Sequence, residues 1–106
     1  FRRTPDGGFA WPGFGENSRV VKWIVERLKG TAGGQETPVG ILPRKEDLDL
    51  AGLEISDEEL DAALRVDKDE WLAELPGIDE WFARLRDVPE VILEQRAGLE
   101  ERLKNS

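Results

Sequence analysis

The chain has 106 residues and a formal net charge of −8, and it contains neither histidine nor cysteine. This length allows one domain or part of one, and so acidic a surface disfavours nucleic-acid binding because it would repel a phosphate backbone. The missing residue types exclude disulfides, a histidine base and the usual nitrogen and sulfur metal ligands, and no apolar run approaches the ~18 residues of a membrane span.

The N-terminal eleven residues are predicted to form a β-hairpin. Thr4-Pro5-Asp6-Gly7 is a strong turn signal, since proline presets φ and glycine supplies a positive φ. The arms would be Phe1 to Arg3 and Gly8 to Trp11. Phe9 and Trp11 alternate along the second arm, so we expect both to point to one face.

The first helix is predicted from about Glu16 to Lys29, with Asn17 and Ser18 suited to its N-cap and Gly30 to the C′ position. Its apolar residues follow the spacing of a buried stripe. These residues are Val21, Ile24, Val25 and Leu28.

The segment after this helix is predicted to be largely irregular. Thr31 to Glu36 is expected to be a flexible loop, and Val39 to Leu42, between two prolines, a short extended segment at most. Three leucines are expected to hold the connection that follows against the core, namely Leu48, Leu50 and Leu53.

The remainder is predicted to be helical. Ser56 with Glu59 makes a capping box for a helix that ends near Leu64. Asp67 with Glu70 repeats this pattern and opens the next helix.

Two prolines should shape the C-terminal helices. Pro76-Gly77 should break or kink the helix that Asp67 opens, because proline removes a helical hydrogen bond. Pro89 is well placed as N1 of the last helix. The large aromatic residues of this region, Trp71, Trp81 and Phe82, are expected to serve the core. The apolar positions of the last helix are Val91, Ile92, Leu99 and Leu103.

These elements predict a mainly α fold with a short N-terminal β-hairpin (α+β). We expect residues 1–106 to form a single segment, in which residues 1–18 are an aromatic hairpin and loop and residues 19–106 a helical remainder.

The aromatic stretch from Phe9 to Arg19 leaves two interpretations open. In the first, the phenylalanines are hairpin core and Asn17 is only a helix cap. In the second, two rings stack on a purine, a third closes its edge and the Asn17 amide meets its polar edge, with each stack worth roughly 1–3 kcal/mol. The backbone groups of Gly15 and Glu16 are near enough to share in telling guanine from adenine, whose hydrogen-bonding edges are reversed.

The same stretch resembles a known family. WPGFGENSR (Trp11 to Arg19), preceded by FRR…GGF (Phe1 to Phe9), is similar to the guanine-binding segment of GTP-dependent phosphoenolpyruvate carboxykinase. TPVGILP (Thr37 to Pro43), LDLAGL (Leu48 to Leu53) and the acidic tail follow in the family's order. The resemblance implies the C-terminal part of the carboxykinase nucleotide-binding domain, at the C-terminal end of that enzyme.

The resemblance also implies roles for individual residues. In the family, the positions that match Phe1 and Phe14 sandwich the guanine, the position of Phe9 contacts the ring edge, and that of Asn17 hydrogen-bonds the base. No catalytic or metal-binding residue is carried over. The expected nucleotide-binding residues are therefore Phe1, Phe9, Phe14, Gly15, Glu16 and Asn17.

The resemblance implies a cytoplasmic carboxy-lyase of gluconeogenesis and anaplerosis. Such an enzyme converts oxaloacetate and GTP reversibly to phosphoenolpyruvate, CO2 and GDP, with Mn2+ and Mg2+ neutralising charge during phosphoryl transfer. The family's phosphate-binding loop and metal ligands lie upstream of Phe1. The segment alone is thus expected to be inactive, with GTP or GDP and the upstream remainder of a monomeric enzyme as its partners.

A second class of function remains open from the residues. The chain would then be a non-catalytic, acidic helical interaction module whose aromatic loop docks a protein partner. The coding sequence upstream of Phe1 separates the two, because a phosphate-binding loop there would support the enzyme.

Overall fold

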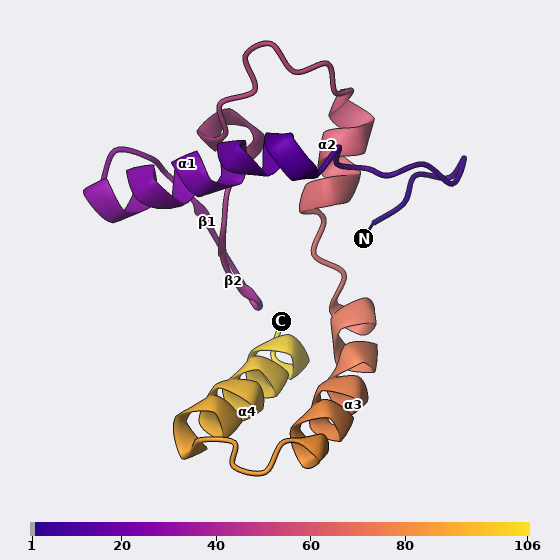
Figure 1. The fold of residues 1–106 in the computed structure, drawn as a ribbon, viewed down its shortest axis with the longest axis vertical. Coiled ribbons are helices and arrows are strands. Elements are labelled where there is room, and N and C mark those ends of the chain that lie inside the picture. The colour runs from indigo at the N-terminus through magenta and orange to yellow at the C-terminus, as the bar shows by residue number, and fades with distance from the viewer. Residues whose placement is uncertain (1) are drawn as a thin grey trace. The chain divides into compact units, whose positions relative to one another are not determined.

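The computed structural model describes residues 2–106, which contain four α-helices and one two-stranded antiparallel sheet (Figure 1). This confirms the predicted mainly α fold with a small β component. In chain order the elements are α1 (Asn17–Lys29), β1 (Gln35–Thr37), β2 (Gly40–Leu42), α2 (Asp57–Leu64), α3 (Lys68–Arg84) and α4 (Glu90–Lys104).

The described chain divides into two compact units. The first contains residues 2–36 and Ile41–Arg65, and the second contains Thr37–Gly40 and Val66–Ser106. No helix in the described part of the chain is long and apolar enough to cross a membrane.

The first unit begins with the predicted turn. The Gly7 N–H donates to the Thr4 carbonyl at 2.9 Å, and the Thr4 hydroxyl donates to the Asp6 carboxylate, which lowers the pKa of Asp6. Arg3 and Phe9 form an isolated antiparallel bridge. The hairpin is therefore confirmed, although its pairing is limited to this bridge.

The core of the first unit centres on Trp23, Leu48 and Leu60, which are buried against one another. The Trp23 indole N–H also donates to the Gly33 carbonyl at 2.9 Å, so the loop after α1 folds back over the helix. The expected placement of Leu48 in the core is confirmed. Partly buried side chains complete the cluster, and they are Trp11, Ala32, Leu50, Ile55 and Leu64.

The predicted buried stripe of α1 is wrong. Trp23 is the buried residue of this helix, whereas Leu28 is 84% exposed and the other three members of the stripe are also exposed. Periodicity identifies an apolar face but not the neighbour that covers it. Here the following loop packs on the side of the helix that carries Trp23.

Two local features follow α1. Gly30 has φ 78° and ends the helix, as predicted. The expected loop of residues 31–36 is wrong at its end, because Gln35–Thr37 pairs with Gly40–Leu42 as a small hairpin. The polar strand β1 lacks the alternating apolar residues by which a half-buried strand is predicted.

Both predicted helix starts of the C-terminal half are confirmed. Ser56 accepts a hydrogen bond from the Glu59 N–H at 3.1 Å and forms the capping box of α2. Asp67 accepts from the backbone N–H groups of Asp69 and Glu70 and caps α3. These caps are readable from sequence because donor and acceptor lie within one turn.

The predicted break at Pro76-Gly77 is wrong, since α3 runs through both residues, whereas the alternative of a kink there stays a prediction. Proline removes one hydrogen bond, but a helix that stopped here would lose the burial of Leu75, which is 3% exposed. Packing therefore overrides local propensity.

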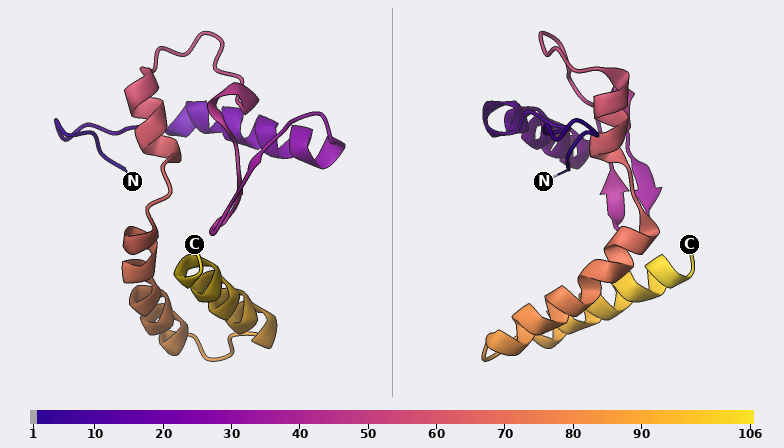
Figure 2. Two further views of the ribbon diagram at one scale, coloured as in Figure 1. Left: turned by 180° about the vertical axis from the view of Figure 1, so that it is seen from behind. Right: turned by 90° about the vertical axis from the view of Figure 1, so that its right-hand side faces the viewer.

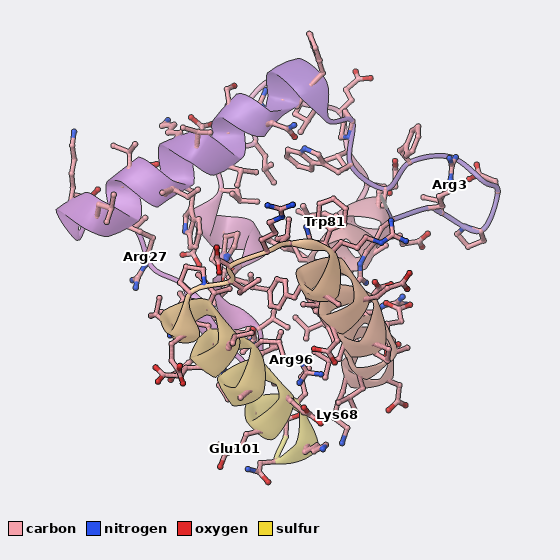
Figure 3. The ribbon with its side chains drawn as sticks, turned by 60° about the horizontal axis from the view of Figure 1, so that its bottom comes forward. Arg3, Arg27, Lys68, Trp81, Arg96 and Glu101 are labelled. Atoms are coloured by element: carbon pink, nitrogen blue, oxygen red, sulfur yellow. The ribbon has the colours of Figure 1, made fainter. Side chains whose placement is uncertain are left out.

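In the second unit α3 and α4 lie side by side, joined by a short loop (Figure 2). Leu103, one of the apolar positions of α4, is fully buried. Figure 3 shows Arg96 between the two helices, where its Nε donates to Asp79 of α3 at 2.7 Å. Arg96 also pairs with Glu100, and these two carboxylates raise the pKa of Arg96.

Trp81 is more exposed than predicted. It is 58% exposed, so its expected core role is wrong; Val91 and Ile92, apolar positions of the last helix, are also exposed. Pro89 is the N-cap of α4 rather than its first residue, a shift of one position.

Candidate functional site

The segment between the N-terminal hairpin and α1 has an unusual backbone. Gly13 has φ 73° and ψ −162°, a region essentially restricted to glycine. Phe14 follows with φ 46° and is the non-glycine residue with positive φ within residues 2–106. Strained backbone conformations of this kind occur preferentially at binding sites. This backbone begins the 3-10 turn Phe14–Glu16 and leaves the Phe14 side chain 98% exposed.

A cavity of about 250 Å³ lies beside this turn. Its walls come from the N-terminal hairpin, the 3-10 turn, the first residue of α1 and one residue of α2. The volume is below the ~300–1,000 Å³ of pockets for drug-sized ligands, so it suits one small flat group. The lining residues are Arg2, Phe9, Trp11, Gly13, Phe14, Asn17 and Ala63.

Three of the expected site residues meet in this cavity, namely Phe9, Phe14 and Asn17. Gly15 and Glu16 lie in the adjoining 3-10 turn but are not among the lining residues. Phe1 lies outside the described residues, so the expected pairing of its ring with that of Phe14 stays a prediction.

Phe9 is half exposed and has one covered face. The Arg3 guanidinium carbon lies 4.4 Å from the centroid of the Phe9 ring, a cation–π contact. Arg3 also donates to the Gly7 carbonyl at 2.9 Å, which holds it over the ring (Figure 3). Phe9 also lines the cavity beside the 3-10 turn.

Asn17 does not act as the expected N-cap. Glu16 occupies the cap position, and Asn17 is the first residue of α1 with helical φ −63° and ψ −20°. The Asn17 side chain instead accepts a hydrogen bond at Oδ1 from the Trp11 indole N–H at 2.9 Å. Ser18 is not a cap either, because its hydroxyl donates to the Gly15 carbonyl.

Arginine side chains fix the walls of the cavity. Arg19 pairs with Glu16 and donates to the carbonyls of Asp49 and Ala51 at 2.8 and 3.0 Å. Arg2 donates to the Ala62 carbonyl of α2 at 3.2 Å, and both views in Figure 2 draw the N-terminal segment beside α2. The cavity is thus built on hydrogen bonds between distant segments.

A neighbouring ion pair links α1 to the segment that contains Asp49. Lys22 binds the Asp49 carboxylate, which raises the pKa of Lys22 and lowers the pKa of Asp49. Both side chains are about half exposed, so we expect this surface pair to add little stability.

Sequence reasoning missed four lining residues, Arg2, Trp11, Gly13 and Ala63. Trp11 could have been considered from the sequence, because its indole N–H needs a hydrogen-bond acceptor and Asn17 lies only six residues further along the chain. Ala63 carried none, since only the packing of α2 brings it to the cavity.

No group of three or more acidic side chains in the described region is placed to hold a metal ion. The candidate site combines aromatic faces, an amide, backbone groups and the side chain of Arg2. Such a set binds and orients a flat polar ligand but supplies no nucleophile or general base.

Comparison with known proteins points to one family. The model for the phosphoenolpyruvate carboxykinase C-terminal P-loop domain matches residues 1–102. A protein of Renibacterium salmoninarum named phosphoenolpyruvate carboxykinase [GTP] is 61% identical over 104 residues, and one of the same name from Paenarthrobacter aurescens is 50% identical; each alignment covers 97% of this chain. Another so named, from Thermoplasma volcanium, is 46% identical over 95 residues, or 90% of the chain. The chain spans only 16–17% of the length of these relatives.

Proposed function

Because the chain belongs to the GTP-dependent phosphoenolpyruvate carboxykinase family, we propose that it supplies the guanine-binding site of such an enzyme. One observation carries this proposal: Phe9, Phe14 and Asn17 line the same small cavity. Aromatic faces there would provide affinity for a base, and the amide would read its polar edge.

In the proposed complex the base stacks on the Phe14 ring. This ring is 98% exposed, so a stacked base would remove apolar surface from water on both partners. The ring of Phe1 would cover the opposite face of the base, and Phe9 would meet its edge. Each stack would contribute roughly 1–3 kcal/mol but would not select among purines.

Selection would come from polar groups at the edge of the base. Backbone groups of Gly15 and Glu16, in the turn beside the cavity, would share in this selection, although the Glu16 N–H already donates to the Gly13 carbonyl. The Asn17 amide would supply the side-chain contact. A polar group matched to guanine is left unpaired by adenine, and such a mismatch discriminates strongly.

The whole protein that carries this chain would interconvert oxaloacetate and GTP with phosphoenolpyruvate, GDP and CO2. Mn2+ and Mg2+ would be bound by residues of that protein outside this chain. This chain would bind and orient the nucleoside, and no bond-making step is assigned to it. The alternative of a free-standing interaction module finds no counterpart in the three relatives compared, each of which is named as a carboxykinase.

Phe14→Ala in the full-length protein tests the proposal. Loss of one stack should weaken GDP binding by about 5- to 150-fold, since 1.4 kcal/mol is a factor of ten. Isothermal titration calorimetry with GDP measures this, and Phe14→Tyr, which keeps the aromatic face, should retain affinity. Unchanged GDP affinity in Phe14→Ala would rule out the stacking role.

A further inference from the structure

We propose that Trp11 is a positioning residue that sets which way the Asn17 amide faces. The indole N–H holds the amide oxygen, so the amide nitrogen is the group presented to a ligand. The site would then select a base with a hydrogen-bond acceptor at position 6, as guanine has. This inference rests on the proposed function and adds a determinant of its specificity.

The assignment of the amide follows from the donor. The indole nitrogen lies 2.9 Å from the Asn17 side-chain oxygen, and an indole N–H only donates. Its partner must therefore be the oxygen, because the opposite orientation would place N–H against N–H. Both side chains line the same cavity, so this contact lies within the candidate site itself.

Trp11 is well suited to transmit a fixed orientation. Its ring is partly buried and packs against the core cluster of Trp23, Leu48 and Leu60. The backbone of Asn17 is also fixed, because Asn17 is the first residue of α1. Rotation of the amide would thus break a hydrogen bond to a side chain that the core holds in place.

The chemistry of purines turns this orientation into selectivity. Guanine carries an acceptor, O6, where adenine carries an amino donor. An amide nitrogen that faces the base donates to O6 but opposes the adenine amino group. An amide released from Trp11 can turn over and accept from adenine, so Trp11 enforces discrimination without touching the discriminating atom.

The test uses Trp11→Phe in the full-length protein, with binding of GTP, ITP and ATP measured by calorimetry. ITP retains O6 but lacks the 2-amino group. We expect GTP and ITP to weaken together and the preference for GTP over ATP to fall by about tenfold, because one oriented hydrogen bond is lost. Trp81→Phe, the same change at an exposed position remote in sequence, is the matched control.

A double-mutant cycle with Asn17→Ala identifies the route of the effect. If Trp11 acts through Asn17, the double variant loses no more selectivity than Asn17→Ala alone. Additive losses of selectivity would overturn the proposal. So would a Trp11→Phe variant that weakens GTP, ITP and ATP equally, since this indicates a packing role only.

Two further measurements keep the outcomes separable. If Phe14→Ala weakens binding of all three nucleotides while Trp11→Phe leaves their ratio unchanged, the guanine site stands and only the role of Trp11 fails. If Trp11→Phe does not fold by circular dichroism, benzothienylalanine at position 11 replaces the indole N–H with sulfur in a ring of similar shape. Full GTP-over-ATP preference in that protein would overturn the inference.

Discussion

The phenylalanines of the candidate site differ from core aromatics in their exposure. Phe14 is 98% exposed and Phe9 is 51% exposed, whereas Trp23 is 8% exposed at the centre of the first core. Phe14 therefore contributes no packing within the described chain, and its backbone is held in a conformation that non-glycine residues rarely adopt. Exposure and strain together fit the role proposed for Phe14 in binding a ligand.

Gly13→Ala tests whether the strained turn presents Phe14. A Cβ at this position would meet no atom within 4 Å, so its cost is conformational, about 1–3 kcal/mol at φ 73° and ψ −162°. We expect the free energy of unfolding, measured in urea, to fall by this amount. If the turn instead shifts to relieve the strain, GDP binding by the full-length protein should weaken.

Gly15→Ala is the control for this change. It also has open space around the added Cβ, but its φ does not fall in the region that disfavours side chains. The stability of this variant should change by less than ~0.5 kcal/mol. Equal losses of stability in the two variants would show that strain at Gly13 is not the cause.

At the scale of elements, some local signals were predictable, whereas the N-cap of α1 and the packing of the helices were not. The caps at Ser56 and Asp67 and the glycine that ends α1 were predicted because their partners lie within one turn. The buried face of α1 and the continuity of α3 depend on which segments fold against them. The candidate site shows the same division: the motif located Phe9, Phe14 and Asn17, whereas Ala63 reaches the cavity only through folding.

Pro76→Ala tests how α3 tolerates its internal proline. Pro76 is exposed, and alanine would restore an N–H donor and a favourable residue in the helix interior. We expect the free energy of unfolding to rise by about 1–3 kcal/mol, measured by urea denaturation.

Pro5→Ala provides the opposite case for the same substitution. Pro5 is exposed in the turn that the Gly7 N–H to Thr4 carbonyl bond closes, where proline is suited to the backbone. Here alanine should lower the free energy of unfolding by about 0.4–1 kcal/mol, because it raises the conformational entropy of the unfolded chain. The two substitutions should therefore have opposite signs, and destabilisation by Pro76→Ala would contradict the account of α3.

At the scale of the whole molecule, two properties of the chain limit its affinity for a nucleotide: its acidic surface and the small volume of its cavity. The net charge of −8 opposes the approach of a nucleotide's phosphates, while the cavity of about 250 Å³ accommodates little more than a base. Affinity from this chain alone would therefore come from stacking and edge contacts. Most of the binding energy for the phosphates would have to come from the remainder of a full-length relative, of which this chain spans 17%.

The isolated chain is accordingly expected to bind GDP weakly, and no more tightly than guanosine. Two stacks of about 2 kcal/mol each would give about 4 kcal/mol, which corresponds to a millimolar dissociation constant, and a single stack would give weaker binding. Calorimetry or NMR titration of the 106-residue chain with both ligands measures this, with the Phe14→Ala chain as the control. Sub-micromolar GDP binding by the isolated chain would mean that its own residues hold the phosphates. This would contradict the assignment of the base to this chain and of the phosphates to the remainder of the protein.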